Sequence, residues 1–274
     1  MELGVVINFN SSFEEKLRWC EKNNIPTCQL SVSPKDLSPD TADVITKLCR
    51  LYGMSITALV GGWSGPNEWN FTGGPLTLGI IPQAYRAMRM NELKECARFA
   101  NLLEVKDICT HMGFIPENPC EPLYADFIVA LRHLVKFYGS FDISLNMETG
   151  QETPVTLMRV LHDINESNLG LNFDPANLLM YGKANPIDAL YLLGKYVNGV
   201  HAKDGEYPTN GTELGLEKPL GKGSVNIEQF IKALFDIGYS GAITIEREIS
   251  GEQQMKDILD ACSLLRSLII SKGV

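Results

Sequence analysis

The sequence predicts an α/β fold: a (β/α)8 TIM barrel made by a single domain, residues 1–274. Short β-branched runs alternate with longer segments of helical periodicity along the whole chain, which indicates a parallel sheet with crossover helices. Eight such runs are present, the number that a closed barrel needs. The length of 274 residues is also one that a single barrel reaches.

The expected strands alternate with helices in chain order, and several helices have readable ends. Thr153-Pro154 and Asn185-Pro186 each place a capping side chain before a proline, which favours a helix start, and Gly238 favours a helix stop. The expected strands are 3–8, 27–32, 54–60, 106–111, 142–148, 169–174, 197–202 and 241–247. The expected helices are 13–23, 40–51, 82–103, 121–138, 153–165, 186–195, 226–236 and 252–270.

Two connections, 61–81 and 203–225, are longer than ordinary loops. They follow the third and seventh strands, so we expect both on the barrel face where active sites form. Trp63, Trp69 and Phe71 in the first loop are candidates to pack against a substrate ring, although aromatic residues also serve to fix a loop in place.

The composition favours a globular protein with a large core and argues against nucleic acid and membranes as partners. Hydrophobic residues make up 45% of the chain, and a formal charge of -9 repels phosphate backbones, so we expect no nucleic acid partner. Seven scattered cysteines without a CxxC pair indicate reduced thiols. The N-terminus has no basic cluster, and its apolar run is too short for a signal or a membrane span. We therefore expect a cytoplasmic protein without membrane association.

Four residues of metal-ligand type stand at the ends of the last four expected strands: Glu148, Asp174, His201 and Glu246. Neighbouring strands converge at the mouth of a barrel, so these side chains can point at one centre despite their separation in sequence. A carboxylate at a strand end is often only a helix cap, and a lone histidine is often a core residue. Together, three carboxylates and an imidazole indicate one divalent metal ion. Mn²⁺ is the first expectation, and Mg²⁺, Co²⁺, Fe²⁺ or Zn²⁺ are alternatives.

These segments resemble the metal-binding motifs of the xylose-isomerase-like barrel superfamily of sugar isomerases and epimerases. The stretches His201-Ala202-Lys203-Asp204, Pro219-Leu220-Gly221-Lys222-Gly223 and Gly238-Tyr239-Ser240-Gly241 resemble that family in order and type. The resemblance is clearest over residues 146–251 and weak before residue 106.

The resemblance implies that Glu148 and Glu246 bind the metal and also act as an acid/base pair beside the carbonyl of a small ketose or polyol ketone. His111, at the end of the fourth strand, is a candidate substrate contact, as are Lys203 and Arg247, which could instead pair with Asp204 or Glu248. His133 and His162 fall within helix patterns and are expected to be structural or exposed. We expect an unphosphorylated substrate, because Gly221-Lys222-Gly223 lacks the strand and helix context of a P-loop. Barrels of this family often pair through their outer helices, so a homo-oligomer is an open alternative.

The sequence departs from the epimerase pattern at two substrate-contacting positions. Asn177 stands where those enzymes tend to carry a histidine, and Tyr207 where they tend to carry an arginine. We retain Asn177 as a candidate substrate contact. An inosose or keto-sugar dehydratase, with His111 or Lys203 as the acid, therefore stays open. An endonuclease-like phosphodiesterase, which needs more histidine ligands, and a non-catalytic sugar-binding barrel are disfavoured.

Overall fold

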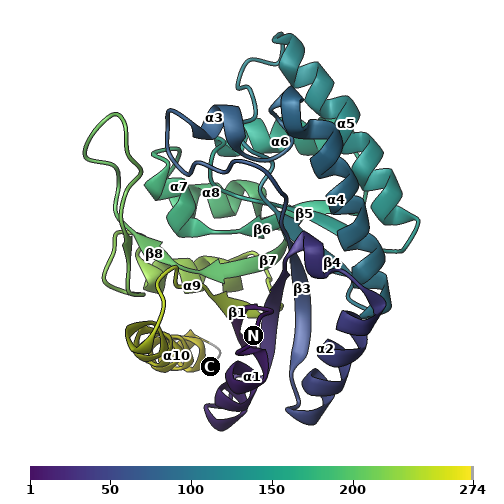
Figure 1. The fold of residues 1–274 in the computed structure, drawn as a ribbon. Helices are drawn as coiled ribbons and strands as arrows, with labels where there is room; N and C mark the ends of the chain where they lie inside the picture. Colours follow the sequence, from purple (N-terminus) through teal and green to yellow (C-terminus); the bar gives the residue numbers. More distant parts are fainter. Residues whose placement is uncertain (273–274) are drawn as a thin grey trace.

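Eight parallel strands close into a barrel in a computed structural model that describes residues 1–272. Strand β1 hydrogen-bonds to both β2 and β10, so the sheet has no free edge, and the remaining strands pair in chain order (Figure 1). The barrel strands are β1 (Leu3–Asn8), β2 (Thr27–Val32), β3 (Ser55–Gly61), β4 (Asp107–Thr110), β5 (Ser144–Glu148), β6 (Leu169–Phe173), β7 (Val197–Ala202) and β10 (Ile243–Ile245).

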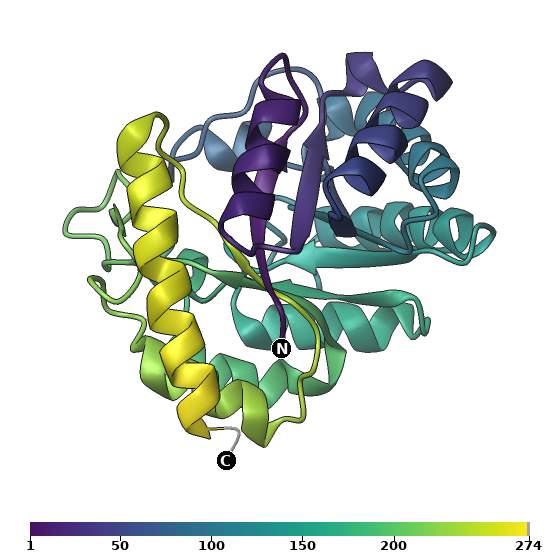
Figure 2. The same cartoon turned by 90° about the horizontal axis from the view of Figure 1, so that it is seen from below.

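Helices surround the barrel and cover its outer face, as the view from below makes clear (Figure 2). The long helices are α1 (Phe13–Lys22), α2 (Pro39–Leu51), α4 (Gln83–Leu102), α5 (Pro122–Gly139), α6 (Pro154–Ile164), α8 (Pro186–Leu193), α9 (Ile227–Asp236) and α10 (Glu252–Lys272). Shorter elements are the helices α3 (Gly74–Thr77) and α7 (Pro175–Met180), the 3-10 turns η1 (Pro34–Asp36) and η2 (Gly194–Tyr196), and the hairpin of β8 (Asp204–Gly205) with β9 (Glu217–Lys218).

The expected strands and long helices are confirmed, with ends that shift by a few residues. Thr153 caps α6 by accepting a hydrogen bond from the Thr156 amide, and the Asn185 side chain caps α8. Gly238 follows α9 with a positive φ of 75°, a conformation that glycine adopts without strain. The sequence did not predict α3, α7 or the β8–β9 hairpin, which occupy stretches that we expected to be irregular.

The apolar faces of the strands and helices form one continuous core around the barrel. Phe173 on β6, for example, stacks on Phe230 of α9 at a centroid distance of 6.0 Å. All seven cysteines are free thiols, as expected, and Cys120 is the exposed one. Within residues 1–272, no helix combines the length and the apolar character that crossing a bilayer requires.

Arg89 on α4 holds the long loop after β3 in place. Its guanidinium is fully buried and donates hydrogen bonds to the carbonyl oxygens of Ser64 (3.2 Å), Pro66 (2.8 Å), Thr77 (2.6 Å) and Gly79 (2.6 Å). The Trp63 and Tyr85 rings lie against the same group, with centroids at 5.5 and 4.8 Å. One side chain thus fixes both ends of a loop that has little regular structure of its own.

Candidate metal centre and active site

The four predicted ligand residues converge at the carboxyl ends of consecutive barrel strands. Glu148 is the last residue of β5, His201 lies near the end of β7, and Glu246 directly follows β10. Asp174 follows β6 and caps α7, because its Oδ1 accepts the Asn177 amide at 2.9 Å. One potential ligand atom from each residue lies within 4.8 Å of the others.

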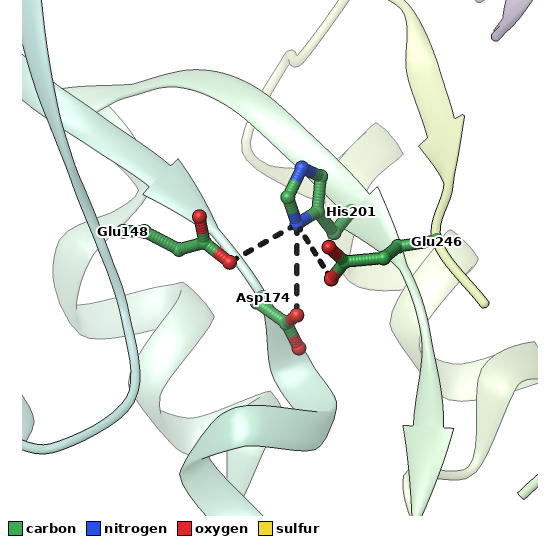
Figure 3. Close-up of side chains that lie close together, drawn as sticks. All are labelled: Glu148, Asp174, His201 and Glu246. Carbon is green, nitrogen blue, oxygen red and sulfur yellow. Dashed lines mark ion pairs between the residues drawn. The ribbon is translucent and has the colours of Figure 1, made fainter. Parts of the chain in front are cut away.

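Figure 3 shows how the carboxylates gather around the His201 imidazole. His201 Nδ1 is 3.3 Å from Glu148 Oε1, 3.3 Å from Glu246 Oε2 and 3.6 Å from Asp174 Oδ2. Glu148 and Glu246 approach from opposite sides of the ring, and Asp174 lies between them (Figure 3). Glu148, Asp174 and His201 are buried, whereas Glu246 keeps 19% of its side chain exposed.

The free donor atoms of this cluster fit a divalent cation. Asp174 Oδ2 and His201 Nδ1 are both buried without a hydrogen-bond partner, although such atoms are normally paired. Both point at the centre that Glu148 and Glu246 also face. Three carboxylates and one imidazole form an oxygen-rich set suited to Mn²⁺ or Mg²⁺ and acceptable to Zn²⁺, Co²⁺ or Fe²⁺.

Lys203 adds a fixed positive charge to the same cluster. Its ammonium is buried and donates to Glu248 Oε1 at 2.6 Å, Glu246 Oε2 at 3.0 Å and Asn177 Oδ1 at 3.3 Å, so its three N–H groups are all directed at protein atoms. Burial alone would lower the pKa of Lys203, but Glu246, Asp174 and Glu248 outweigh it and hold the pKa well above its ordinary value. Lys203 is therefore an internal counter-charge rather than an open substrate contact.

The local charges also set the protonation of the two glutamates. Burial would raise the pKa of Glu246, yet Lys203 and His201 lower it to about 2. Burial would likewise raise the pKa of Glu148, yet His111 and His201 hold it well below its ordinary range. Both groups are therefore carboxylates at neutral pH, the form that can bind a cation or accept a proton.

A cavity of about 370 Å³ opens over the cluster. Its wall includes both glutamates and two of the predicted substrate contacts, His111 and Asn177. The Trp69 ring contacts the His111 ring edge-on at 5.0 Å, and His111 Nε2 lies 3.4 Å from Glu148 Oε1. The remaining lining residues are Val60, Met180, Tyr181, Leu214 and Glu248. The loops 61–81 and 203–225 thus both contribute to this cavity, through Trp69 and Leu214.

Other predicted residues lie outside this wall. Trp63 packs against Arg89, and Arg247 pairs with Glu217 at 2.5 Å and Asp257 at 2.8 Å on the α10 side. Tyr207 donates its hydroxyl to the Gly182 carbonyl at 3.2 Å and is 57% exposed, so it does not replace an arginine at the metal centre. Asn177 does reach the centre, because its Nδ2 lies 3.3 Å from Glu148 Oε1.

The His133 and His162 side chains contact neighbouring residues away from the cluster. His133 lies 2.8 Å from Lys94 Nζ, and the His162 ring contacts that of Tyr196. Both histidines belong to helices, as expected from their positions in the sequence.

Asp204 explains the glycine-rich stretch after the seventh strand. Its Oδ2 accepts the amides of Gly221 and Gly223 at 2.9 Å each, and its Oδ1 accepts those of Gly205 at 2.9 Å and Val225 at 3.0 Å. A Cβ at Gly223 would lie 2.3 Å from Asp204 Oδ1. These amides therefore bind a carboxylate of the protein itself, in agreement with the expectation that this is no phosphate loop.

Sequence reasoning missed several residues around the site. Tyr181 and Glu248 line the cavity, and Oε1 of Gln29 on β2 lies 2.8 Å from His201 Nε2. Glu152 is fully buried, and burial raises the pKa of its carboxyl group to about 7. The available signals were polar residues inside buried segments: Gln29 within an apolar strand, and Gln151-Glu152 directly after Glu148.

The chain belongs to the xylose isomerase-like TIM barrel family, whose model matches residues 17–268. A crystal structure of a xylose isomerase domain protein from Planctomyces limnophilus is 32% identical, with a TM-score of 0.94 and coverage of 99% of this chain and 98% of that one. Uncharacterized protein MJ1311 of Methanocaldococcus jannaschii is 26% identical over 186 residues. That match spans 64% of this chain and 62% of the relative's own length.

More distant solved structures share the fold. A D-tagatose 3-epimerase-like protein has a TM-score of 0.78 at 20% identity and covers 100% of this chain and 98% of its own. The IOLI protein, whose crystal structure contains a bound zinc atom, has a TM-score of 0.71 at 15% identity and covers 98% of this chain and 99% of its own. At these identities the comparison establishes the barrel alone.

Proposed function

We propose that this protein is a divalent-metal-dependent sugar isomerase or epimerase that acts on a small ketose or related polyol ketone. Glu148 and Glu246 serve as its acid/base pair. The family and the likeness to an epimerase-like barrel support this class. The bound zinc atom of the IOLI protein, a barrel of similar fold, supports a metal ion in this one.

The observation that carries the proposal is the placement of the two glutamates. Glu148 and Glu246 face one centre from opposite sides and line the same cavity (Figure 3). Moving a proton from one face of a carbon to the other requires two such groups within reach of both faces. Glu148 takes the proton next to the carbonyl, and Glu246 returns one on the other face.

Asp174 and His201 would hold the cation together with both glutamates. A divalent cation supplies polarisation of the carbonyl and compensates the negative charge that develops when the neighbouring carbon loses its proton. Asn177 and Lys203 keep Glu148 and Glu246 in position through direct hydrogen bonds. Trp69 and Tyr181 contribute aromatic side chains to the cavity wall, against which the carbon skeleton of a sugar can pack.

The lining of the cavity favours a neutral substrate. Its described side chains include three glutamates and no lysine or arginine. A phosphate group would therefore find no lysine or arginine side chain there to pair with. An unphosphorylated polyol, which offers hydroxyl groups to carboxylate and imidazole partners, fits this lining better.

The test is solvent proton exchange in D₂O with Mn²⁺ and a panel of ketoses and inososes. We expect deuterium beside the carbonyl with the wild type, and a loss of at least about 100-fold in exchange rate with Glu148→Gln or Glu246→Gln. Glu117→Gln, a change at an exposed residue away from the cavity, is the matched control. A metal-loaded protein that exchanges no substrate of the panel would contradict the proposal.

A second candidate is a dehydratase acting on an inosose or keto-sugar. His111 favours it, because this imidazole lines the cavity beside Glu148 and could protonate a departing hydroxyl group. The same incubation separates the two reactions: an epimer retains all its oxygen atoms, whereas a dehydratase product is lighter by one water molecule.

A further inference from the structure

We propose that Gln29 is a positioning residue that fixes the tautomer of His201 and so makes its Nδ1 a metal ligand. Gln29 lies on β2, on the opposite side of the barrel from the β5 and β6 ligands, and is buried. This inference rests on the metal centre of the proposed function and adds a residue that the ligand set does not contain.

The hydrogen bond between the two side chains determines which nitrogen of His201 carries the proton. His201 Nε2 lies 2.8 Å from Gln29 Oε1, and a carbonyl oxygen can only accept a hydrogen bond. Nε2 therefore holds the proton. In the neutral imidazole this leaves a lone pair on Nδ1, the atom that faces Glu148, Asp174 and Glu246 without a hydrogen-bond partner of its own.

The Gln29 amide is itself held in this orientation. Its Nε2 donates to Asn172 Oδ1 at 2.8 Å, and its Oε1 also accepts the Cys109 thiol at 3.3 Å. If the Gln29 amide were flipped, its oxygen would face the Asn172 oxygen, and two acceptors would lie against each other. The flipped amide would also lose the hydrogen bond from the Cys109 thiol. The Asn172 oxygen and the Cys109 thiol together favour the orientation in which the Gln29 oxygen faces His201.

The barrel backbone adapts to this chain of side chains. The pairing of β2 with β3 shifts register at Gln29, and that of β6 with β7 shifts at Asn172. Such irregularities redirect side chains next to active sites. A Cβ at Gly199 on β7 would lie 2.3 Å from Asn172 Oδ1, so glycine leaves the space that this amide occupies. Three strands therefore contribute to the placement of one hydrogen bond.

Histidine ligands of metals generally depend on a partner of this kind, whose loss costs about 10- to 100-fold in metal affinity. We expect Gln29→Leu to weaken Zn²⁺ and Mn²⁺ binding by about that factor, measured by competition with a chelator. Gln29→Glu keeps an acceptor oxygen facing Nε2 and should restore most of the affinity. Asn146→Leu is the matched control, because Asn146 is a buried amide that hydrogen-bonds to Asp107 and Asn198 and not to His201. This variant should leave the metal affinity unchanged.

The tautomer can also be read directly in the wild-type protein. The chain has 4 histidines, so ¹⁵N spectra of the histidine-labelled, zinc-loaded wild type can be assigned by single substitutions. We expect His201 to show a protonated Nε2 and a zinc-bound Nδ1. Zinc on Nε2, or a Gln29→Leu protein that melts normally and binds metal as tightly as the wild type, would overturn the inference.

The two proposals fail in different ways in this experiment. A wild-type protein that binds no zinc or manganese removes the metal centre and with it both proposals. Normal binding by both the wild type and Gln29→Leu removes the positioning role alone. If Gln29→Leu does not fold, Asn172→Ala provides the second test, because it removes the acceptor that orients the Gln29 amide and so frees the Gln29 oxygen to turn away from His201; unchanged affinity in that variant would also count against the role.

Discussion

Replacing Arg89 with leucine should destabilise the protein strongly and release the loop that carries Trp69. The side chain makes four hydrogen bonds to main-chain carbonyls between residues 64 and 79, and the buried guanidinium forms no ion pair within the described residues. The substitution removes the charge and leaves four carbonyl oxygens without this donor, two of them on the buried residues Thr77 and Gly79.

The magnitude follows from these contacts. Hydrogen bonds to a charged donor contribute about 1.5–3 kcal/mol each, so four set an upper bound of roughly 6–12 kcal/mol. The cost of burying the guanidinium, several kcal/mol, offsets part of this gain. We therefore expect Arg89→Leu to lower the free energy of unfolding by about 3–5 kcal/mol.

Urea denaturation measures the loss, and hydrogen exchange of residues 62–80 measures release of the loop. Arg98→Leu is the matched control, because Arg98 lies on the same helix, pairs with Glu95 and keeps 50% of its side chain exposed. We expect that control to change stability by less than about 1 kcal/mol. An Arg89→Leu protein as stable as the control, with unchanged exchange in the loop, would refute the reasoning.

Three further predictions concern buried charges near the site. Folding raises the pKa of Glu152 from 4.5 to about 7, so the folded state favours its protonated form and stability falls as pH rises across that range. Glu152→Gln should therefore gain up to about 3 kcal/mol over the wild type at pH 8 and nothing at pH 4, by urea denaturation at each pH; parallel pH profiles would argue against this. Lys203→Met should cost about 3–5 kcal/mol in EDTA, because it leaves Glu246 and Glu248 without their cation. Added Mn²⁺ should recover part of that loss. An equal loss of stability in EDTA and in Mn²⁺ would show that Lys203 and the metal ion do not neutralise the same carboxylates. Asp204→Asn should lower the melting temperature through a loss of about 2–4 kcal/mol, because its NH₂ group replaces one acceptor oxygen, so either Gly221 and Gly223 or Gly205 and Val225 lose the acceptor of their backbone N–H groups; a loss under about 1 kcal/mol would show that these hydrogen bonds do not hold the loop.

The barrel and the cluster of four candidate ligand residues were predictable because each depends on a short-range pattern. Alternating strands and helices define the fold, and Glu148, Asp174 and His201 interrupt apolar strand ends. Once the strands close in order, their carboxyl ends must meet, so the topology brings these residues together.

The supporting residues were not predictable, because their roles depend on side-chain direction. Trp63 and Trp69 stand in the same loop, yet Trp63 packs on Arg89 whereas Trp69 reaches the cavity. Lys203 follows a metal-ligand candidate directly, but its contacts with Glu246 and Glu248 bridge more than forty residues of chain. Register shifts such as the one at Gln29 cannot be read from the sequence, because they do not change the pattern of apolar and polar residues.

The way in which Arg89 holds its loop has a consequence for how substrate preference can diverge in this barrel. Arg89 binds main-chain carbonyl oxygens, which every residue type provides, so the course of the loop does not depend on which side chains it displays. Trp69, on this loop, can therefore be exchanged for a smaller or a polar residue without moving the frame that carries it. Substitutions at this position can therefore change which substrates fit, while the loop backbone and the carboxylate and histidine cluster keep their structure.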